Sequence, residues 1–225
     1  MLFDLRSRGR RRTVQAVYLG LALLMGGGLV LFGVGAGNGV GGLLNAFTGG
    51  GSNNQSQVVS QQEKQALRQT RLHPTDPTGW AALVQARWTS AGQGSNYDTG
   101  TARFTASGKK ELAKMEQAWI RYLQLTKNPD PNTAILAARG LAQVGNFAGA
   151  ADAWEISAAA NPGSARGYEC LAASAYAASQ TRKGDLATAK ALTLVPKVQR
   201  ATTQKALQAA KTSTQTAQQV AQQQC

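Results

Sequence analysis

Apolar residues are arranged in two different ways along this chain. Near the N-terminus they form one continuous run, from Val14 to Ala36, that contains no charged side chain. Such a run, at about 1.5 Å per helical residue, is long enough to cross a hydrocarbon core about 30 Å thick. From about residue 58 onward, apolar residues recur every three or four positions between polar ones, which is the period of helices that bury one face. The pattern predicts an all-α protein in which an N-terminal transmembrane helix precedes a helical domain.

Arginines gather on one side of the apolar run. Those between residues 6 and 12 precede it, and Asp4 is the only acidic residue there. Because Lys and Arg collect on the cytoplasmic side of a span, residues 1–12 are predicted to be a cytoplasmic basic tail, 13–36 a transmembrane signal anchor, and the remainder extracytoplasmic. A cleaved secretory signal is the alternative, since Val34 and Ala36 offer small residues for cleavage. The run exceeds the core of about 7–15 residues usual in signal peptides, which favours an uncleaved anchor in the cell membrane.

Prolines recur at a regular interval along the helical domain. Pro129, Pro162 and Pro196 each close a helical stretch and lie 33 and 34 residues apart. That period is typical of stacked units of two antiparallel helices. The middle unit, 131–162, is the clearest, with a turn at Gly145 and Asn146 between its helices. Its apolar packing positions are Ala134, Ala137, Ala138, Leu141, Ala150, Ala151 and Trp154. The domain is therefore predicted to be a short α-solenoid of antiparallel helix pairs, in which each unit buries its apolar face on the next.

The units on either side of the middle one depart from the pattern. The following unit starts near Ala165, and Ser179 stands where the middle unit has its turn glycine, which predicts that the turn shifts to Gly184. The preceding unit starts at Pro77 but closes roughly 21 residues late, which identifies an insertion at 90–108 and a second helix over 110–127. Insertions in repeat proteins fall in loops on one face, often the binding face. A neutral surface loop is the alternative.

The remaining segments complete the predicted domain organisation. Residues 37–57 form a Gly/Asn/Gln/Ser linker, and a helix over 58–72 caps the helical domain, which spans 58–196. Residues 197–225 are predicted to be a C-terminal helix that frays into a Gln-rich tail.

Over roughly residues 77–196 the chain resembles the tetratricopeptide repeat (TPR) family. The residues that carry the resemblance are Gly145, Phe147, Ala150, Trp154, Pro162, Tyr168, Leu171, Ala191 and Pro196. With the basic tail and the span, they look like the membrane-anchored TPR proteins of actinobacteria, and the layout is similar to the ancillary TPR subunit of the bacterial Sec translocon. The resemblance implies protein scaffolding without a cofactor, with first helices lining a concave face. On that face Arg87, Arg139 and Arg166 are the expected partner-binding residues, because planar guanidinium groups pair with carboxylates.

Side chains suited to catalysis or metal binding are scarce. The only histidine, His73, precedes Pro74 in a predicted turn, without the nucleophile and orienting group that a catalytic triad requires. Two cysteines, Cys170 and Cys225, are too few for a zinc site of four ligands. The sequence therefore predicts no enzyme activity, metal or cofactor.

The same two cysteines leave two interpretations open. Outside the cytoplasm a disulfide can persist, and a Cys170–Cys225 bridge would staple the terminal helix to the third repeat. Alternatively, Cys170 is a buried small apolar thiol and Cys225 a loose one.

The formal net charge of +13 bears on the partner. It favours an acidic protein, anionic lipid or cell-wall polymer, and the predicted location excludes nucleic acid. The first hypothesis is a single-pass membrane-anchored scaffold that binds proteins on the outer side of the cytoplasmic membrane. Its partner would be an exported chain or a translocon-associated factor, and its role secretion or envelope assembly. The alternative is a structural envelope factor whose basic domain binds anionic lipid or wall polymer.

Overall fold

The computed structural model describes residues 53–225, and these residues are mostly helical. The all-α prediction is confirmed for them at the level of fold class. The helices are α3 (Asn53–Leu72), α4 (Pro77–Ala91), α5 (Ala106–Leu125), α6 (Pro131–Gln143), α7 (Phe147–Ala160), α8 (Ala165–Ala177), α9 (Thr181–Leu194), α10 (Lys197–Thr212) and α11 (Thr214–Gln223). No helix within this part of the chain is long and apolar enough to cross a membrane. The predicted tail and span, 1–36, lie outside the described residues.

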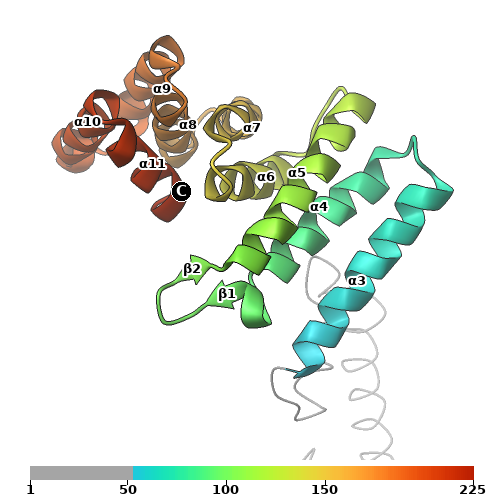
Figure 1. Ribbon diagram of the computed structural model, residues 1–225. Helices are drawn as coiled ribbons and strands as arrows, with labels where there is room; N and C mark the ends of the chain where they lie inside the picture. Colours follow the sequence, from blue (N-terminus) through green and yellow to red (C-terminus); the bar gives the residue numbers. More distant parts are fainter. Residues whose placement is uncertain (1–52) are drawn as a thin grey trace, which may run out of the picture. The chain divides into compact units, whose positions relative to one another are not determined.

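Successive helices pack against each other along the chain (Figure 1). Contacts join α4 to α5, α6 to α7, α7 to α8 and α8 to α9. Alanines dominate the shared core, and several of those in α6, α7 and α8 have no exposed surface. Larger side chains such as Leu112, Met115 and Leu141 fill the remaining space, and Trp154 is only 3% exposed. Small residues let the helix axes approach closely. The apolar residues that recur every three or four positions in the sequence therefore form one continuous core.

Polar residues placed just before the helices fix where they begin. Asp130 precedes Pro131 and accepts a hydrogen bond from the Thr133 backbone N at 2.7 Å. Asn146 accepts one from the Gly149 backbone N at 2.9 Å. Side chains at these positions satisfy backbone N–H groups that have no partner within the helix, and proline suits the first helical position. Helix α6 accordingly begins at Pro131, and the turn at Gly145 and Asn146 separates it from α7.

The turn between α8 and α9 corrects one prediction. Ser179 itself adopts the left-handed conformation, with φ 60°, and so replaces Gly145, whose φ is 86°. Gly184 does not form the turn, because it lies inside α9 and packs against the ring of Tyr176. A side chain at position 184 would collide with that ring. The glycine therefore serves close packing between α8 and α9.

The inserted segment 90–108 is an ordered structure with short strands. After α4 it forms a 3-10 turn (Gly94–Asn96) and a hairpin of β1 (Tyr97–Asp98) and β2 (Arg103–Phe104). Tyr97 pairs with Phe104 and Asp98 with Arg103 in antiparallel register. Helix α5 then begins at Ala106, earlier than the predicted residue 110. We refer to residues 97–104 as the hairpin.

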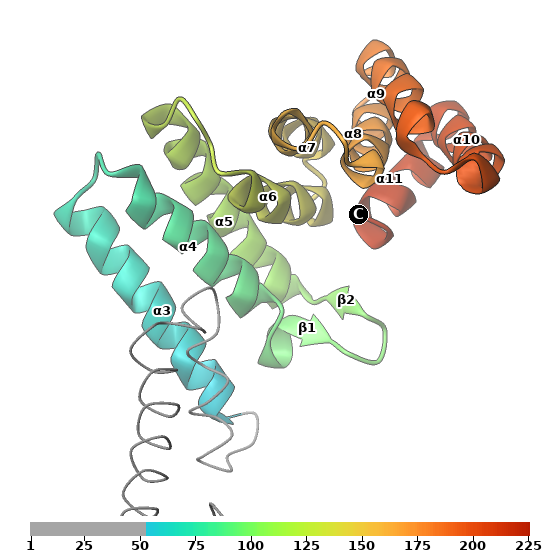
Figure 2. The same cartoon turned by 180° about the vertical axis from the view of Figure 1, so that it is seen from behind.

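Both ends of the domain are more helical than predicted. Helix α3 starts at Asn53, inside the predicted linker 37–57. The tail does not fray, because after α10 a second helix, α11, turns back onto α8 and α6 (Figure 2). Ser213 makes the turn and caps α11 by accepting a hydrogen bond from the Thr216 backbone N. Ala217 and Ala221, four residues apart, form the buried face of α11, a pairing too sparse to stand out in the sequence.

Candidate functional site

A cleft of about 1090 Å³ lies where the hairpin and the end of α11 come near each other. Both views place the chain end beside the hairpin (Figures 1 and 2). The residues that line the cleft fall into three groups. Helices α4 and α6 contribute Trp88, Thr89, Arg139 and Gln143; the segment from Gly92 to Lys109 contributes Gly92, Gln93, Tyr97, Thr101, Ala102, Arg103, Phe104 and Lys109; the C-terminal segment contributes Gln215, Gln218, Gln219, Ala221, Gln222, Gln223 and Cys225. The cleft is therefore built from the regular helices, the insertion and the C-terminal segment together.

Three aromatic rings form the apolar part of the cleft. Phe104 on β2 lies 5.2 Å from Tyr97 and 5.8 Å from Trp88, measured between ring centroids, in tilted or edge-on arrangements. Such pairs add stability beyond the area they bury. All three rings are half-buried, so each keeps a surface that a ligand can contact.

Short contacts hold the hairpin in this position. The Thr105 hydroxyl donates to the backbone oxygen of Ser95 at 2.9 Å, and the same oxygen atom of Thr105 caps α5. Gly108, in the first turn of α5, packs directly on the backbone oxygen of Asn96. The start of α5 is therefore locked to the base of the hairpin.

Three cations, Arg103, Lys109 and Arg139, line the cleft, and no Asp or Glu does. Their side chains are exposed, and within residues 53–225 none of them forms an ion pair with an Asp or Glu side chain. Arg139 Nε is instead bonded to the oxygen of Cys225 at 2.8 Å. Asp98 is opposite Arg103 in the hairpin register, but its carboxylate binds the turn instead. The Thr101 hydroxyl, followed by the backbone N–H groups of Gly100 and Thr101, lowers the pKa of Asp98. Within this part of the protein, Arg103 and Lys109 thus have no ion-pair partner.

Every carboxylate of the described part has a partner elsewhere. Asp76 and Asp130 cap helices, Asp98 closes the hairpin turn, and Glu116 accepts a hydrogen bond from Asn146. The other carboxylates form ion pairs: Glu63 with Arg87, Glu111 with Lys114, Asp152 and Glu155 with Lys183, Glu169 with Arg166, and Asp185 with Lys211. None of these Asp and Glu side chains is therefore bound to Arg103, Lys109 or Arg139.

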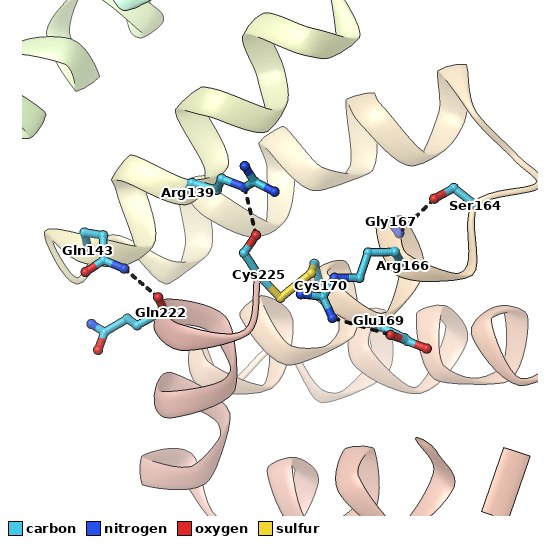
Figure 3. Close-up of a disulfide and its surroundings, with 9 residues drawn as sticks. All are labelled: Arg139, Gln143, Ser164, Arg166, Gly167, Glu169, Cys170, Gln222 and Cys225. Atoms are coloured by element: carbon cyan, nitrogen blue, oxygen red, sulfur yellow. Dashed lines mark hydrogen bonds and ion pairs between the residues drawn. A yellow bond between two sulfur atoms is a disulfide. The ribbon is translucent and has the colours of Figure 1, made fainter. Parts of the chain in front are cut away.

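The C-terminal wall is attached to α6 and α8 by polar and covalent contacts (Figure 3). Arg139 Nε donates to the Cys225 backbone oxygen at 2.8 Å, and Gln143 Nε2 donates to the Gln222 oxygen at 2.6 Å. Gln222 Nε2 returns a hydrogen bond to the Ala142 oxygen at 2.9 Å. A disulfide joins Cys225 to Cys170 of α8, with the two Cα atoms 5.5 Å apart. Of the two interpretations of the cysteines, the structure contains the bridged one.

The three arginines predicted to bind a partner have different surroundings. Arg139 lines the cleft. Arg87 is 13% exposed and lies 3.5 Å from Glu63 of α3, so it joins α3 to α4. Arg166 is exposed, lies 4.0 Å from Glu169 on its own helix, and is not part of the cleft lining. The structure thus brings only one of the three to this site.

Sequence reasoning did not single out Arg103, Lys109 or the glutamines of α11. The late closing proline did identify the insertion, which contains Arg103. No local signal showed that a Gln-rich tail would fold back onto α6. Within residues 53–225, no group of His, Cys, Asp and Glu side chains is arranged to hold a metal ion.

The chain was compared with known proteins in three ways. A scan against protein-family models gives no match, and searches of curated proteins and of solved structures give no significant match.

Proposed function

We propose that this protein is a membrane-anchored helical-repeat scaffold of the TPR type that binds a protein partner on the outer side of the cytoplasmic membrane. The uncharged run Val14–Ala36 and the arginines before it support the anchor. The period of the prolines and the paired helices α6–α7 and α8–α9 support the repeat assignment. The scaffold role covers exported chains or translocon-associated factors as partners, in secretion or envelope assembly.

The observation that carries the proposal is the composition of the cleft. It combines half-buried aromatic rings, amide side chains and three cations, none of which forms an ion pair with an Asp or Glu side chain of the described residues. Aromatic and arginine side chains are enriched in protein interfaces, and amides donate and accept the hydrogen bonds that a peptide backbone requires. The volume lies slightly above the range of about 300–1,000 Å³ usual for small-molecule pockets, which suits a polymer segment. We therefore take the ligand to be an extended peptide with carboxylate and apolar side chains.

A peptide-binding measurement tests this proposal. The probe is a fluorescent peptide of alternating Glu and Leu residues, and the matched probe has Gln in place of Glu. We expect the acidic peptide to bind the full chain and Arg103→Gln to weaken it roughly tenfold, since hydrogen bonds to charged groups contribute about 1.5–3 kcal/mol. Lys205→Gln, which removes an exposed cation from α10, is the control. Equal affinity for both probes, or equal loss in both variants, would contradict the proposal.

The same test can be made in the cell. A photo-crosslinking residue at Thr101 lies in the cleft, and one at Val198 lies on α10, where that side chain is 89% exposed. A partner bound in the cleft should give an adduct from position 101 that Arg103→Gln and Arg139→Gln reduce. If both positions gave adducts, and the two substitutions did not change the amount of either, binding in the cleft would be contradicted.

The alternative function is adhesion to anionic lipid or wall polymer. Helix α10 favours it, because Lys197, Arg200 and Lys205 are exposed and form no ion pair within the described chain. Binding by charge alone falls steeply with ionic strength, whereas contacts with aromatic rings persist. Binding to vesicles of anionic lipid that disappears in high salt and survives Arg103→Gln would favour this alternative.

A further inference from the structure

Helix α11 is a wall of the cleft that has little apolar attachment of its own. Its buried residues are Ala217 and Ala221, and most of its remaining side chains are glutamines. A helix of this length is marginal in water unless tertiary contacts hold it. For comparison, α8 buries a continuous series of residues from Cys170 to Ala177. Val220 of α11 is partly buried against the same core, but the apolar face of α11 remains much smaller than that of α8, so α11 depends on further attachments at its ends.

The Cys170–Cys225 disulfide supplies the missing attachment. It lies beyond the last turn of α11, while Ser213 ties the first turn to α10, so the helix is held at both ends. The two cysteines are 55 residues apart in sequence, so the bridge removes much of the freedom of the C-terminal segment. The distance of 5.5 Å between the two Cα atoms suits a disulfide. Cys170 has no exposed surface, so the bridge is part of the folded core.

We propose that the disulfide is a redox lock on the cleft: α11 docks as its wall only while Cys170 and Cys225 are joined, and the cleft binds its acidic peptide only in that state. The peptide half of this inference rests on the proposed function. With the lock closed, glutamines of α11 line the cleft together with the aromatic rings. With the lock open, the cleft loses this wall and Arg139 loses the backbone oxygen that positions its side chain.

Opening the lock requires an external dithiol as reductant. Cys225 is half-buried and Cys170 fully buried, so the dithiol's thiolate attacks Cys225 Sγ. The Cys170–Cys225 bond breaks, Cys170 leaves as a thiolate and takes up a proton, and a mixed disulfide remains on Cys225. The second thiol of the reductant then attacks its own sulfur in that mixed disulfide. Cys225 leaves and is protonated, and the dithiol becomes a disulfide, so two electrons and two protons have passed to the protein.

Amide hydrogen exchange on the full chain tests the lock without any ligand. Exchange is compared in the oxidised protein and after treatment with dithiothreitol. We expect amides of 214–223 to exchange at least roughly tenfold faster after reduction, while those of α8 keep their protection. Cys225→Ser should behave like the reduced protein without any reductant. Unchanged protection of α11 in the reduced protein would overturn the lock.

Peptide affinity then tests the role of α11 as a wall. The acidic probe should bind the oxidised protein and lose at least roughly tenfold in affinity on reduction. Gln218→Glu with Gln219→Glu, at cleft-lining positions of α11, should weaken the probe while the disulfide stays intact. Binding that survives both the release of α11 and these substitutions overturns the wall. If the oxidised protein binds neither probe, the proposed function and its peptide half fail, and hydrogen exchange alone still decides the lock.

Discussion

Helices α6–α9 and the two segments that flank the cleft, the hairpin and α11, are held in place by different forces. The four helices pack through alanines that have no exposed surface, and Trp154 and Leu141 complete their core. The hairpin is held by three half-buried rings and a hydroxyl contact, and α11 by two buried alanines, the partly buried Val220, a few hydrogen bonds and a disulfide. The first region is stabilised by burial and the second by specific contacts.

The distribution of charge follows the same division. Carboxylates in the regular helices form ion pairs, as Lys183 does with Asp152 and Glu155 at 2.7 and 2.8 Å. The cations of the cleft form no ion pair with an Asp or Glu side chain of the described chain, and Arg139 binds the Cys225 oxygen instead. The comparison shows that the regular helices are stabilised by burial, and that the cleft forms where the hairpin and α11 add their polar and aromatic groups to residues of α4 and α6.

The largest effect is expected in the regular region. Trp154→Ala should lower the free energy of unfolding by about 3–5 kcal/mol, because it removes a buried indole from α7. Urea unfolding followed by circular dichroism measures this loss. Trp88→Ala, which removes a half-buried ring of the cleft, should cost clearly less and serves as the matched variant. A larger loss of unfolding free energy in Trp88→Ala than in Trp154→Ala would contradict the view that the regular helices contribute most of the stability.

The disulfide should give the second largest effect. Reducing it should lower the free energy of unfolding by up to about 4 kcal/mol, as expected from chain entropy for a separation of 55 residues. The measurement is urea unfolding of the oxidised and reduced protein. Cys170→Ala with Cys225→Ser should match the reduced protein and control for the reductant. If reduction destabilised α4 and α5 as much as the C-terminal helices, the disulfide would not act on α11 in particular.

A smaller effect is expected where the hairpin meets α5. A methyl group in Gly108→Ala would collide with the backbone oxygen of Asn96, so the base of the hairpin must shift, at a cost of about 1–3 kcal/mol. Gly163→Ala is the matched control, because nothing lies within 4 Å of a side chain there. Thermal unfolding gives the stability change, and the acidic probe should bind Gly108→Ala more weakly. Equal effects of the two substitutions would show that the hairpin is not tightly seated.

The smallest effect concerns pH. Burial, opposed by a hydrogen bond with Thr188 and assisted by Asp185, raises the pKa of Tyr176 to about 12. Because an unfolded tyrosine titrates near about 10, the folded state holds this proton more tightly. Its contribution to stability is complete below about pH 10 and is lost as the pH rises toward 12. Urea midpoints should fall over that interval, and less so in Tyr176→Phe. An identical fall in both proteins would assign it to other groups.

The regular helices were predictable because their signals are local. Proline and an oxygen-bearing side chain mark the start of α6, and a glycine with positive φ ends the turn before α7. The turn at Ser179 was missed because a serine can adopt the same conformation when the surrounding helices fix it. Gly184 was misassigned to the turn because its role depends on another helix: a glycine is needed there to make room for the ring of Tyr176. Arg87 was expected on a binding face, and its pairing with Glu63 depends on where α3 packs.

The sequence by itself determined the helical class of the described residues, the positions of α6 and α7, the start of α8 and a non-helical segment between α4 and α5, because apolar period, capping residues and proline spacing act over a few residues. Only the tertiary structure decided that the insertion becomes a hairpin, that the Gln-rich tail folds back as α11, and that Cys225 reaches Cys170. These outcomes depend on which distant surfaces meet. The cleft therefore exists only in three dimensions, where Arg103, Lys109 and Arg139 come together from separate segments.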